Sequence, residues 1–280
     1  MMRLVWLTPA ARQKRPAAEA GAWFERTVWL LALLAAPVPS SGSGAAPAPR
    51  VVVVQPVRSL GSAAADRQAR ACQQRVAELL DAAGVPVRVT PDMALSEARL
   101  KPFKVAVLPF NALDEGGVAA LRAFVARGGR ILAFYPKAPA SFFTLLGVAS
   151  TGPRAPDPPD AFRRIALESA LAAEGFPERI EQGSWSALEL APREGTRVVG
   201  WWEGKGGRAG AAVTLNRAGM LVGHVLTAEG PRTKRQFLLA ALGRLNSGVW
   251  GDAAQTQRAR ALSRLHEQRA RWIRLTAHPG

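Results

Sequence analysis

Between residues 50 and 134, short apolar runs alternate with longer segments whose apolar residues recur at helical spacing. The first run, Val51–Val54, contains only β-branched residues, which is typical of a strand buried on both faces of a parallel sheet. Val85–Val89, Lys104–Phe110 and Arg130–Phe134 predict three more strands. Strands that alternate with amphipathic helices predict an α/β fold, with a doubly wound, mostly parallel sheet and helices on both faces.

Two segments between these runs carry apolar residues on one helical face. The first bears Ala65, Ala69, Cys72, Val76, Leu79 and Leu80. It stops at Gly84, a residue type that commonly ends helices. The second follows Asp114, a suitable N-cap, and stops at Gly128-Gly129. Cys72 is the only cysteine, so no disulfide can form within the chain, and its place on an apolar face predicts a small buried side chain.

The second half of the sequence predicts a loop, a helix, three strands and a further helix. Residues 151–159 are rich in proline, and residues 160–174 have helical spacing. Strands are expected over Thr196–Glu203 and Ala211–Leu226, the latter divided by a turn at residues 216–219. Pro231 suits the first turn of the last helix of the domain.

The two ends of the chain differ from this pattern. Arg26 precedes the apolar run 28–36, which is followed by prolines and small residues up to Ala46. This order is typical of a signal peptide, and the run is too short for a stable membrane span; a buried N-terminal helix is the alternative. Residues 251–280 are basic and weakly amphipathic. We therefore predict a leader at 1–46, one α/β domain at 47–250 and a helical tail or linker at 251–280, in an exported protein of the periplasm or the extracellular space.

The net charge of +16 raises the question of nucleic-acid binding. Nearly all of the positive charge is arginine, since lysine occurs only at positions 14, 101, 104, 137, 205 and 234. The arginines are scattered along the chain, apart from clusters near its two ends. Together with the abundance of Ala, Gly and Pro, this usage indicates GC-rich codons and argues against a nucleic-acid partner.

Several stretches resemble the class I glutamine amidotransferase-like superfamily: Val51–Val54, the strand Val105–Pro109, and the step of helix, Gly-Gly and strand at Leu121–Ile131. Gly219–Thr227 and the helix that contains residues 238–243 extend the resemblance to the last strand and helix of that fold. The sequence is most similar to non-catalytic members, such as the trimerisation domain of certain β-galactosidases and the domain that precedes a glycosyl-hydrolase-like barrel in exported bacterial proteins. The resemblance implies a flavodoxin-like sheet.

Catalytic members of that superfamily carry a cysteine nucleophile on a strained turn after a strand, and a histidine activates it. The matching turn here is Tyr135-Pro136-Lys137, which contains neither cysteine nor serine. Pro136 also lacks a backbone N–H that could face an oxyanion. His224 lies near the place of the family's histidine. Because His224 has no nucleophile to activate, we expect it to have a structural or ligand-contacting role. We therefore expect no catalytic residue in this chain.

Cofactor and metal motifs are missing as well. His224, His266 and His278 have no ligand spacing. The segment Gly204–Gly207 lacks the frame of a phosphate-binding loop and suits a hairpin turn better. We therefore expect no cofactor and no metal.

The remaining candidates for ligand or partner contact are aromatic or basic. Ligands of doubly wound sheets bind beyond the carboxyl ends of the strands, where Tyr135 and Lys137 are expected. Trp201 and Trp202 are neighbours on a strand, so one ring should face the core while the other can be exposed. These four residues and His224 form the predicted contact set. The alternative is that the three aromatic rings of Tyr135, Trp201 and Trp202 belong to the core.

The sequence thus favours a non-catalytic interaction or accessory domain of an exported, carbohydrate-active protein. The expected partner is a carbohydrate or a glycosyl-hydrolase-like domain. A second copy of this chain, in a homo-oligomer, is a further alternative. The alternatives are a divergent hydrolase that uses the strand carboxyl ends without a cysteine nucleophile, and a basic partner-binding protein. Convergent polar groups near Phe110 and Tyr135 would favour the enzyme, whereas an aromatic or apolar patch would favour the module.

Overall fold

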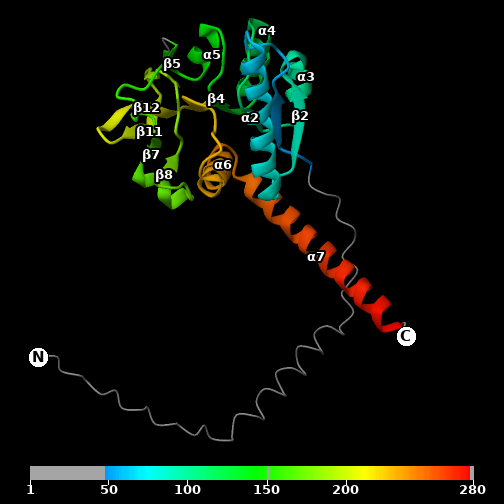
Figure 1. The fold of residues 1–280 in the computed structure, drawn as a ribbon. Helices are drawn as coiled ribbons and strands as arrows, with labels where there is room; N and C mark the ends of the chain where they lie inside the picture. Colours follow the sequence, from blue (N-terminus) through cyan, green and yellow to red (C-terminus); the bar gives the residue numbers. More distant parts are fainter. Residues whose placement is uncertain (1–47, 150–151, 278–280) are drawn as a thin grey trace, which may run out of the picture. The chain divides into compact units, whose positions relative to one another are not determined.

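The computed structural model describes residues 48–149 and 152–277, with side chains as far as residue 272. The predicted leader at 1–46 lies outside the described residues. The main feature of the domain is a nine-stranded sheet with the order β2-β1-β3-β4-β13-β12-β11-β7-β8 (Figure 1). Helices pack on both of its faces, so the predicted α/β class with a doubly wound sheet is confirmed.

The first five strands in this order are parallel. They are β2 (Val87–Pro91), β1 (Val51–Gln55), β3 (Val105–Leu108), β4 (Arg130–Phe134) and β13 (Gly219–Val222). The helical elements that follow β1, β2, β3 and β4 along the chain are α2 (Ala63–Ala82), η2 (Asp92–Ala94), α3 (Glu97–Leu100), α4 (Glu115–Ala126) and α5 (Ala140–Leu145). Ser62 caps α2 and Asp114 caps α4 through side-chain oxygens that accept backbone N–H bonds.

The other four strands extend the sheet in antiparallel fashion. They are β12 (Gly207–Leu215), β11 (Arg197–Gly204), β7 (Arg164–Leu167) and β8 (Arg179–Glu181). The predicted helix at 160–174 is wrong, because β7 and the 3-10 helix η3 (Ser169–Glu174) occupy it. A short apolar run is compatible with a strand as well as with a helix. Here residues 164–167 form a strand because they pair with the edge of β11. Two small ribbons, β5 (Val148–Ala149) with β10 (Ala191–Pro192) and β6 (Pro153–Arg154) with β9 (Ala187–Leu188), cover one end.

The two faces of the sheet are buried by different helices. Val51 and Val53 of β1 point into a cluster with α2 and with α6 (Pro231–Leu245). Val52 and Val54 point into a second cluster with α3, α4 and α5. Because successive side chains of a strand alternate in direction, a run of four valines provides apolar side chains to both clusters. This is the burial that the continuous β-branched run predicts.

The last helix, α7, runs over Gly248–Ala277 and extends away from the sheet (Figure 1). Its first two turns pack on the domain, since Val249 and Ala253 are buried and Asp252 pairs with Arg50. From residue 261 to residue 272 every side chain is exposed. The division at residue 250 stays a prediction. No helix in the described part of the chain combines the length and the apolar character that a membrane crossing requires.

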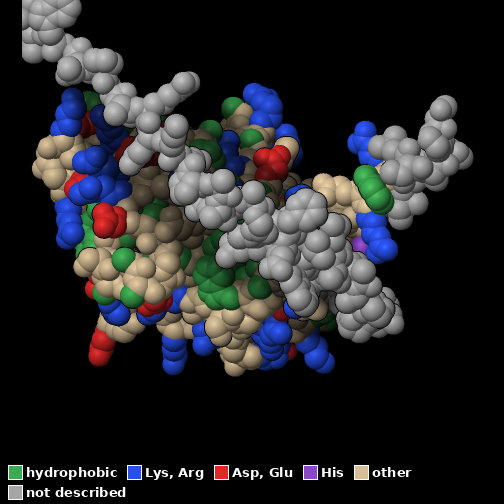
Figure 2. Space-filling view, turned by 90° about the horizontal axis from the view of Figure 1, so that it is seen from below, with side chains coloured by type: hydrophobic (Ala, Val, Ile, Leu, Met, Phe, Trp, Pro, Cys, Tyr) green, Lys and Arg blue, Asp and Glu red, His purple; other side chains and the backbone are tan. Residues whose placement is uncertain are grey.

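Charged side chains of both signs are present on one face of the domain. On the face that Figure 2 shows, lysine and arginine side chains are spread around the margin, with single acidic side chains among them. This distribution agrees with the scatter of arginine along the sequence.

Candidate functional site

The turn after β4 is the most unusual piece of backbone in the domain. Tyr135 has a φ of 46°, and no other non-glycine residue that the structure describes has a positive φ. Its backbone N–H donates to the carbonyl of Val222 on β13, which fixes the turn between two parallel strands. Residues other than glycine rarely adopt a positive φ, and those that do are concentrated at functional sites. A tyrosine with this backbone conformation therefore occupies the turn at which the sequence resemblance implies a nucleophile.

The ring of Tyr135 is half-buried and held on several sides. It packs against Phe110, with ring centroids 5.5 Å apart, and against His224, with centroids 5.0 Å apart. The phenol hydroxyl lies 3.0 Å from Oγ of Ser186, which donates onward to the carbonyl of Arg154. The tyrosine side chain is thus held in place by two rings and by the hydroxyl of Ser186.

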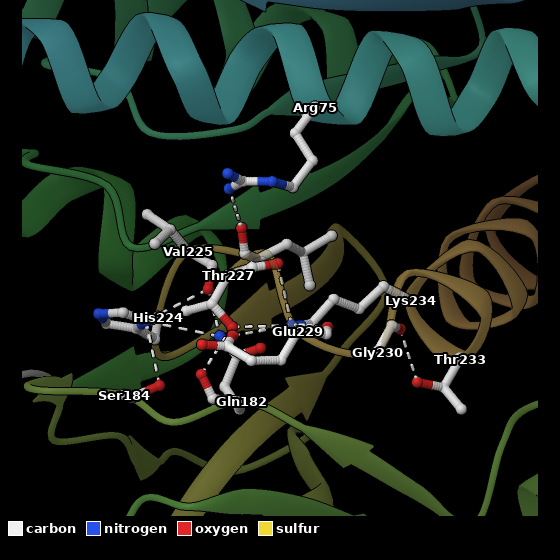
Figure 3. A network of polar contacts seen from close by, with 11 residues as sticks. Arg75, Gln182, Ser184, His224, Val225, Thr227, Glu229, Gly230, Thr233 and Lys234 are labelled. Atoms are coloured by element: carbon white, nitrogen blue, oxygen red, sulfur yellow. Dashed lines mark hydrogen bonds and ion pairs between the residues drawn. The ribbon is translucent and has the colours of Figure 1, made fainter.

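His224 is fully buried directly after β13. Its Nδ1 lies 3.1 Å from Oγ of Ser184 and 3.2 Å from the carbonyl of Val225 (Figure 3). Its Nε2 has no hydrogen-bond partner among the described residues. Burial lowers the pKa of His224 to about 4. The Val225 carbonyl opposes that shift, and the positive charge of Lys234 adds to it. The imidazole is therefore neutral at physiological pH.

Lys234 is the second buried titratable group of this region. It lies in the first turn of α6 and points back into the loop that follows β13 (Figure 3). Its Nζ donates to the carbonyl of Thr227 at 2.9 Å, to the hydroxyl of Thr227 at 2.7 Å and to the carbonyl of Glu229. Burial lowers the pKa of Lys234 to about 8, against the opposing effect of the Glu229 carboxylate. The ammonium group thereby fixes the shape of the loop 227–230.

Two hollows flank the indole of Trp185, which is 52% exposed. One, of about 260 Å³, lies between α2 and the loop after β13. Its lining is Gln68, Ala71, Cys72, Arg75, Gly183, Trp185, Val225, Thr227, Ala228 and Glu229. The other, of about 370 Å³, is lined by Pro156, Pro159, Asp160, Phe162, Arg163, Gly183, Ser184 and Trp185. Trp185 stands edge-on to His224, with centroids 4.3 Å apart. An exposed aromatic ring therefore separates two small cavities above a buried histidine.

Further polar groups meet at the carboxyl end of β3, and they brace a loop. The carboxylate of Asp92 is buried and accepts the backbone N–H groups of Val57 and Arg58. Asn111 donates to the same carboxylate and to the carbonyl of Val54. These hydrogen bonds join the carboxylate of Asp92 to the loop after β1. Asp92 therefore stabilises the structure near Phe110.

The arrangement supports binding better than proton transfer. Ser184 and His224 form a hydroxyl and imidazole pair. A pKa near 4 makes the imidazole a weak proton acceptor at neutral pH. Burial raises the pKa of Cys72 to about 11, so its thiol stays protonated and is a poor nucleophile. Across the described residues, no three His, Cys, Asp or Glu side chains gather as a possible metal-binding set.

The structure brings together only part of the predicted contact set. Tyr135 and His224 are in contact, and Lys137 lies nearby, where its Nζ donates to the carbonyl of Leu60 before α2. Trp202 is 1% exposed and packs on Phe162, so it is the ring of the pair that faces the core. Trp201 is covered by the guanidinium of Arg208, 4.3 Å from its ring centroid.

The tryptophan pair also lies away from the turn at Tyr135. Trp201 and Trp202 are on β11, and β13 and β12 separate β11 from β4. Strand alternation correctly places one ring inside. The antiparallel extension of the sheet, which the sequence pattern does not show, moves the pair away from the crevice.

Trp185, Ser184 and Gln182 were not among the predicted contact residues, because they reach the site through long-range contacts. The side-chain amide of Gln182 donates to the carbonyl of Val225, and its backbone carbonyl accepts from the hydroxyl of Thr227. Lys234 had a usable signal. It is one of only six lysines in a chain whose positive charge is almost entirely arginine, and the same is true of Lys137.

Comparison with known proteins gives structural matches only. No protein-family model matches the sequence, and no curated protein sequence matches it. A ThuA-like protein from Bacteroides uniformis aligns over 75% of this chain and 95% of its own, with a TM-score of 0.55 and 13% identity. An α-L-fucosidase from Paenibacillus thiaminolyticus aligns over 71% of this chain and 33% of its own, with a TM-score of 0.51 and 13% identity.

A GH42 β-galactosidase from G. stearothermophilus aligns over 70% of this chain and 30% of its own, with a TM-score of 0.50 and 16% identity. This chain therefore spans about a third of the length of the two glycosidases. At these identities the likeness concerns the fold alone. It agrees with the α/β architecture that the sequence predicts.

Proposed function

We propose that this chain is a non-catalytic, ligand-binding accessory domain of an exported, carbohydrate-active protein. The observation that carries the proposal is the turn at Tyr135. It keeps a positive φ and a neighbouring histidine, while a tethered phenol ring stands where a nucleophile would act. A crevice that loses its nucleophile but keeps its walls can still bind.

The binding surface in this proposal is Trp185 with the two hollows beside it. An exposed indole offers a flat apolar face to the C–H side of a sugar ring. Arg75, Gln68 and Glu229 line the smaller hollow and supply donors and acceptors for hydroxyl groups. The proposed ligand is therefore a neutral sugar unit bound at the carboxyl edge of the parallel strands.

The structural matches support a carbohydrate setting. Two of them are glycosidases in which the matching part is about a third of the chain, as expected of an accessory domain within a larger protein. Export is part of the proposal and is supported by the order of the residues at 1–46. N-terminal sequencing of the mature protein tests it, and an intact Met1 on cytoplasmic protein would exclude it.

Binding is tested by titrating the purified chain with a panel of neutral oligosaccharides, using isothermal calorimetry. We expect Trp185→Ala to abolish the binding of any hit without lowering the melting temperature, because the ring is half exposed. Trp201→Ala is the matched control and should bind normally. Equal binding by the wild type and by Trp185→Ala would remove the indole from the site.

A divergent hydrolase is the second candidate, favoured by the 3.1 Å contact between Ser184 and His224. It predicts turnover of nitrophenyl esters or glycosides that Ser184→Ala abolishes. The accessory domain predicts no turnover above buffer for the wild type. Measurable hydrolysis that is lost in Ser184→Ala would replace our proposal with the enzyme.

A further inference from the structure

A row of cations runs along the amino edge of the sheet, opposite the edge that holds Tyr135. Arg50 directly precedes β1, Lys104 precedes β3, and Arg130 is the first residue of β4. Arg217 lies in the turn before β13, and Arg197 is the first residue of β11. We call these five residues the basic edge.

The pairing of the strands places these residues side by side. Lys104 donates its backbone N–H to the carbonyl of Arg50, and Arg130 donates to the carbonyl of Lys104. Arg197 pairs with Leu215, whose strand ends at the turn that contains Arg217. From β1 to β11 the edge crosses five strand spacings, which corresponds to about 24 Å. Cations that are scattered in the sequence thus become a line in the fold.

Only part of this charge is neutralised. Arg50 pairs with Asp252, and Arg197 makes two bonds to the carboxylate of Glu168. Among the described residues, no carboxylate pairs with Lys104, Arg130 or Arg217. Uncompensated charges in a row repel one another, so an anion that neutralises them is favoured.

The surface beside the row is concave. The lining of a hollow of about 470 Å³ includes Arg130, Glu174, Arg197, Arg217 and Arg244. The lining of a second hollow, of about 580 Å³, includes Arg122, Arg130 and Arg217. Arg130 and Arg217 belong to both, so the hollows are neighbours along the basic edge. Of their five arginines, Arg197 and Arg244 pair with carboxylates, whereas no carboxylate in the described part of the chain pairs with Arg122, Arg130 or Arg217.

We propose that the basic edge and its two hollows bind an acidic polysaccharide, one that carries carboxylate or sulfate groups along an extended chain. Guanidinium groups match such oxyanions with paired hydrogen bonds, and a line of cations suits a linear polyanion. A single-stranded nucleic acid would need aromatic rings on which its bases stack, and neither hollow is lined by one. The choice of a glycan over a DNA duplex rests on the proposed function, whereas the site itself does not.

The test is fluorescence anisotropy on the full chain with labelled heparin and polygalacturonate oligosaccharides, at about 50 and 200 mM salt. We expect binding that weakens at the higher salt concentration. Replacing two uncompensated cations in Arg130→Gln/Arg217→Gln should weaken it about tenfold or more, since each removes bonds to a charged group. The control, Arg232→Gln/Arg235→Gln, removes the same charge from exposed positions on α6 and should change the affinity less than twofold. Melting temperatures verify that both variants fold.

Three outcomes would overturn the assignment: no binding of either acidic glycan, an equal loss in the control variant, or tighter binding of a short DNA duplex at the same salt concentration. The results distinguish the proposal for the basic edge from the proposal for the Trp185 site. Neutral sugars that still bind at Trp185 while acidic glycans do not would end this inference and leave the proposed function intact. Acidic glycans that bind at the basic edge while no neutral sugar binds would support this inference and count against the Trp185 site.

Discussion

The buried histidine makes this protein sensitive to acid over a defined pH range. Burial lowers the pKa of His224 from 6.5 to about 4. Above pH 6.5 the ring is neutral in the folded and unfolded chain, so it adds no pH dependence. As the pH falls from 6.5 to 4, the unfolded chain binds a proton that the folded chain does not, and the free energy of unfolding decreases. One pKa unit corresponds to about 1.4 kcal/mol, which gives a loss of about 3 kcal/mol.

The assay is urea unfolding followed by circular dichroism at several pH values between 7 and 4, for the wild type and for His224→Asn. Asparagine keeps a polar group beside Ser184 but does not titrate. The carboxylates with lowered pKa, Asp66, Glu203 and Glu229, are present in both proteins and cancel in the difference. The wild type should lose about 3 kcal/mol more than the variant over this range. An equal decline in both proteins would refute the reasoning.

Three more predictions concern the core, the loop and the tail. In chemical denaturation, Trp202→Ala should lower the free energy of unfolding by about 3–5 kcal/mol, and Trp201→Ala by about 1 kcal/mol. Relative to Lys234→Met, the wild type should gain stability in urea unfolding from pH 8 to 10.5, because the unfolded chain keeps the proton of Lys234 longer than the folded chain does. The thiol of Cys72, whose pKa burial raises to about 11, lowers stability over part of this range, but it is present in both proteins and cancels in the difference. Lys234→Met should be destabilised by about 2–4 kcal/mol near pH 7 through its unpaired acceptors. Ending the chain after Ser263 should leave the melting temperature within about 2 °C, whereas ending it after Trp250 should lower it by several degrees, because buried contacts of α7 are lost.

The parallel half of the fold could be predicted from sequence because its signals are local. A strand that is buried on both faces needs an apolar side chain at every position, which Val51–Val54 shows directly. The helix with Cys72 on its inner face has the expected spacing, and that side chain is buried. The caps Ser62 and Asp114 mark helix starts within a few residues.

The antiparallel half depends on partners that a local pattern does not contain. Ile165-Ala166-Leu167 could continue a helix or form a strand, and it becomes β7 because β11 offers it an edge. The same holds for the candidate site. Tyr135 and His224 follow strands, so topology predicts that they meet. Trp185 reaches them only because Gln182 and Ser184 bond to residues some forty positions later.

The strand that completes the sheet is the last strand along the chain. β13 pairs with β4 on one side and with β12 on the other, so it joins the parallel and antiparallel halves. Until residues 219–222 have been synthesised, each half presents an unpaired edge, and such edges invite association with other chains. Pairing of Gly219 with Ile131 also closes a long loop, a contact of high sequence separation that slows folding. The order of synthesis therefore delays the native topology until β13 itself has been made, and pairing of β13 becomes the step on which folding of the whole sheet depends.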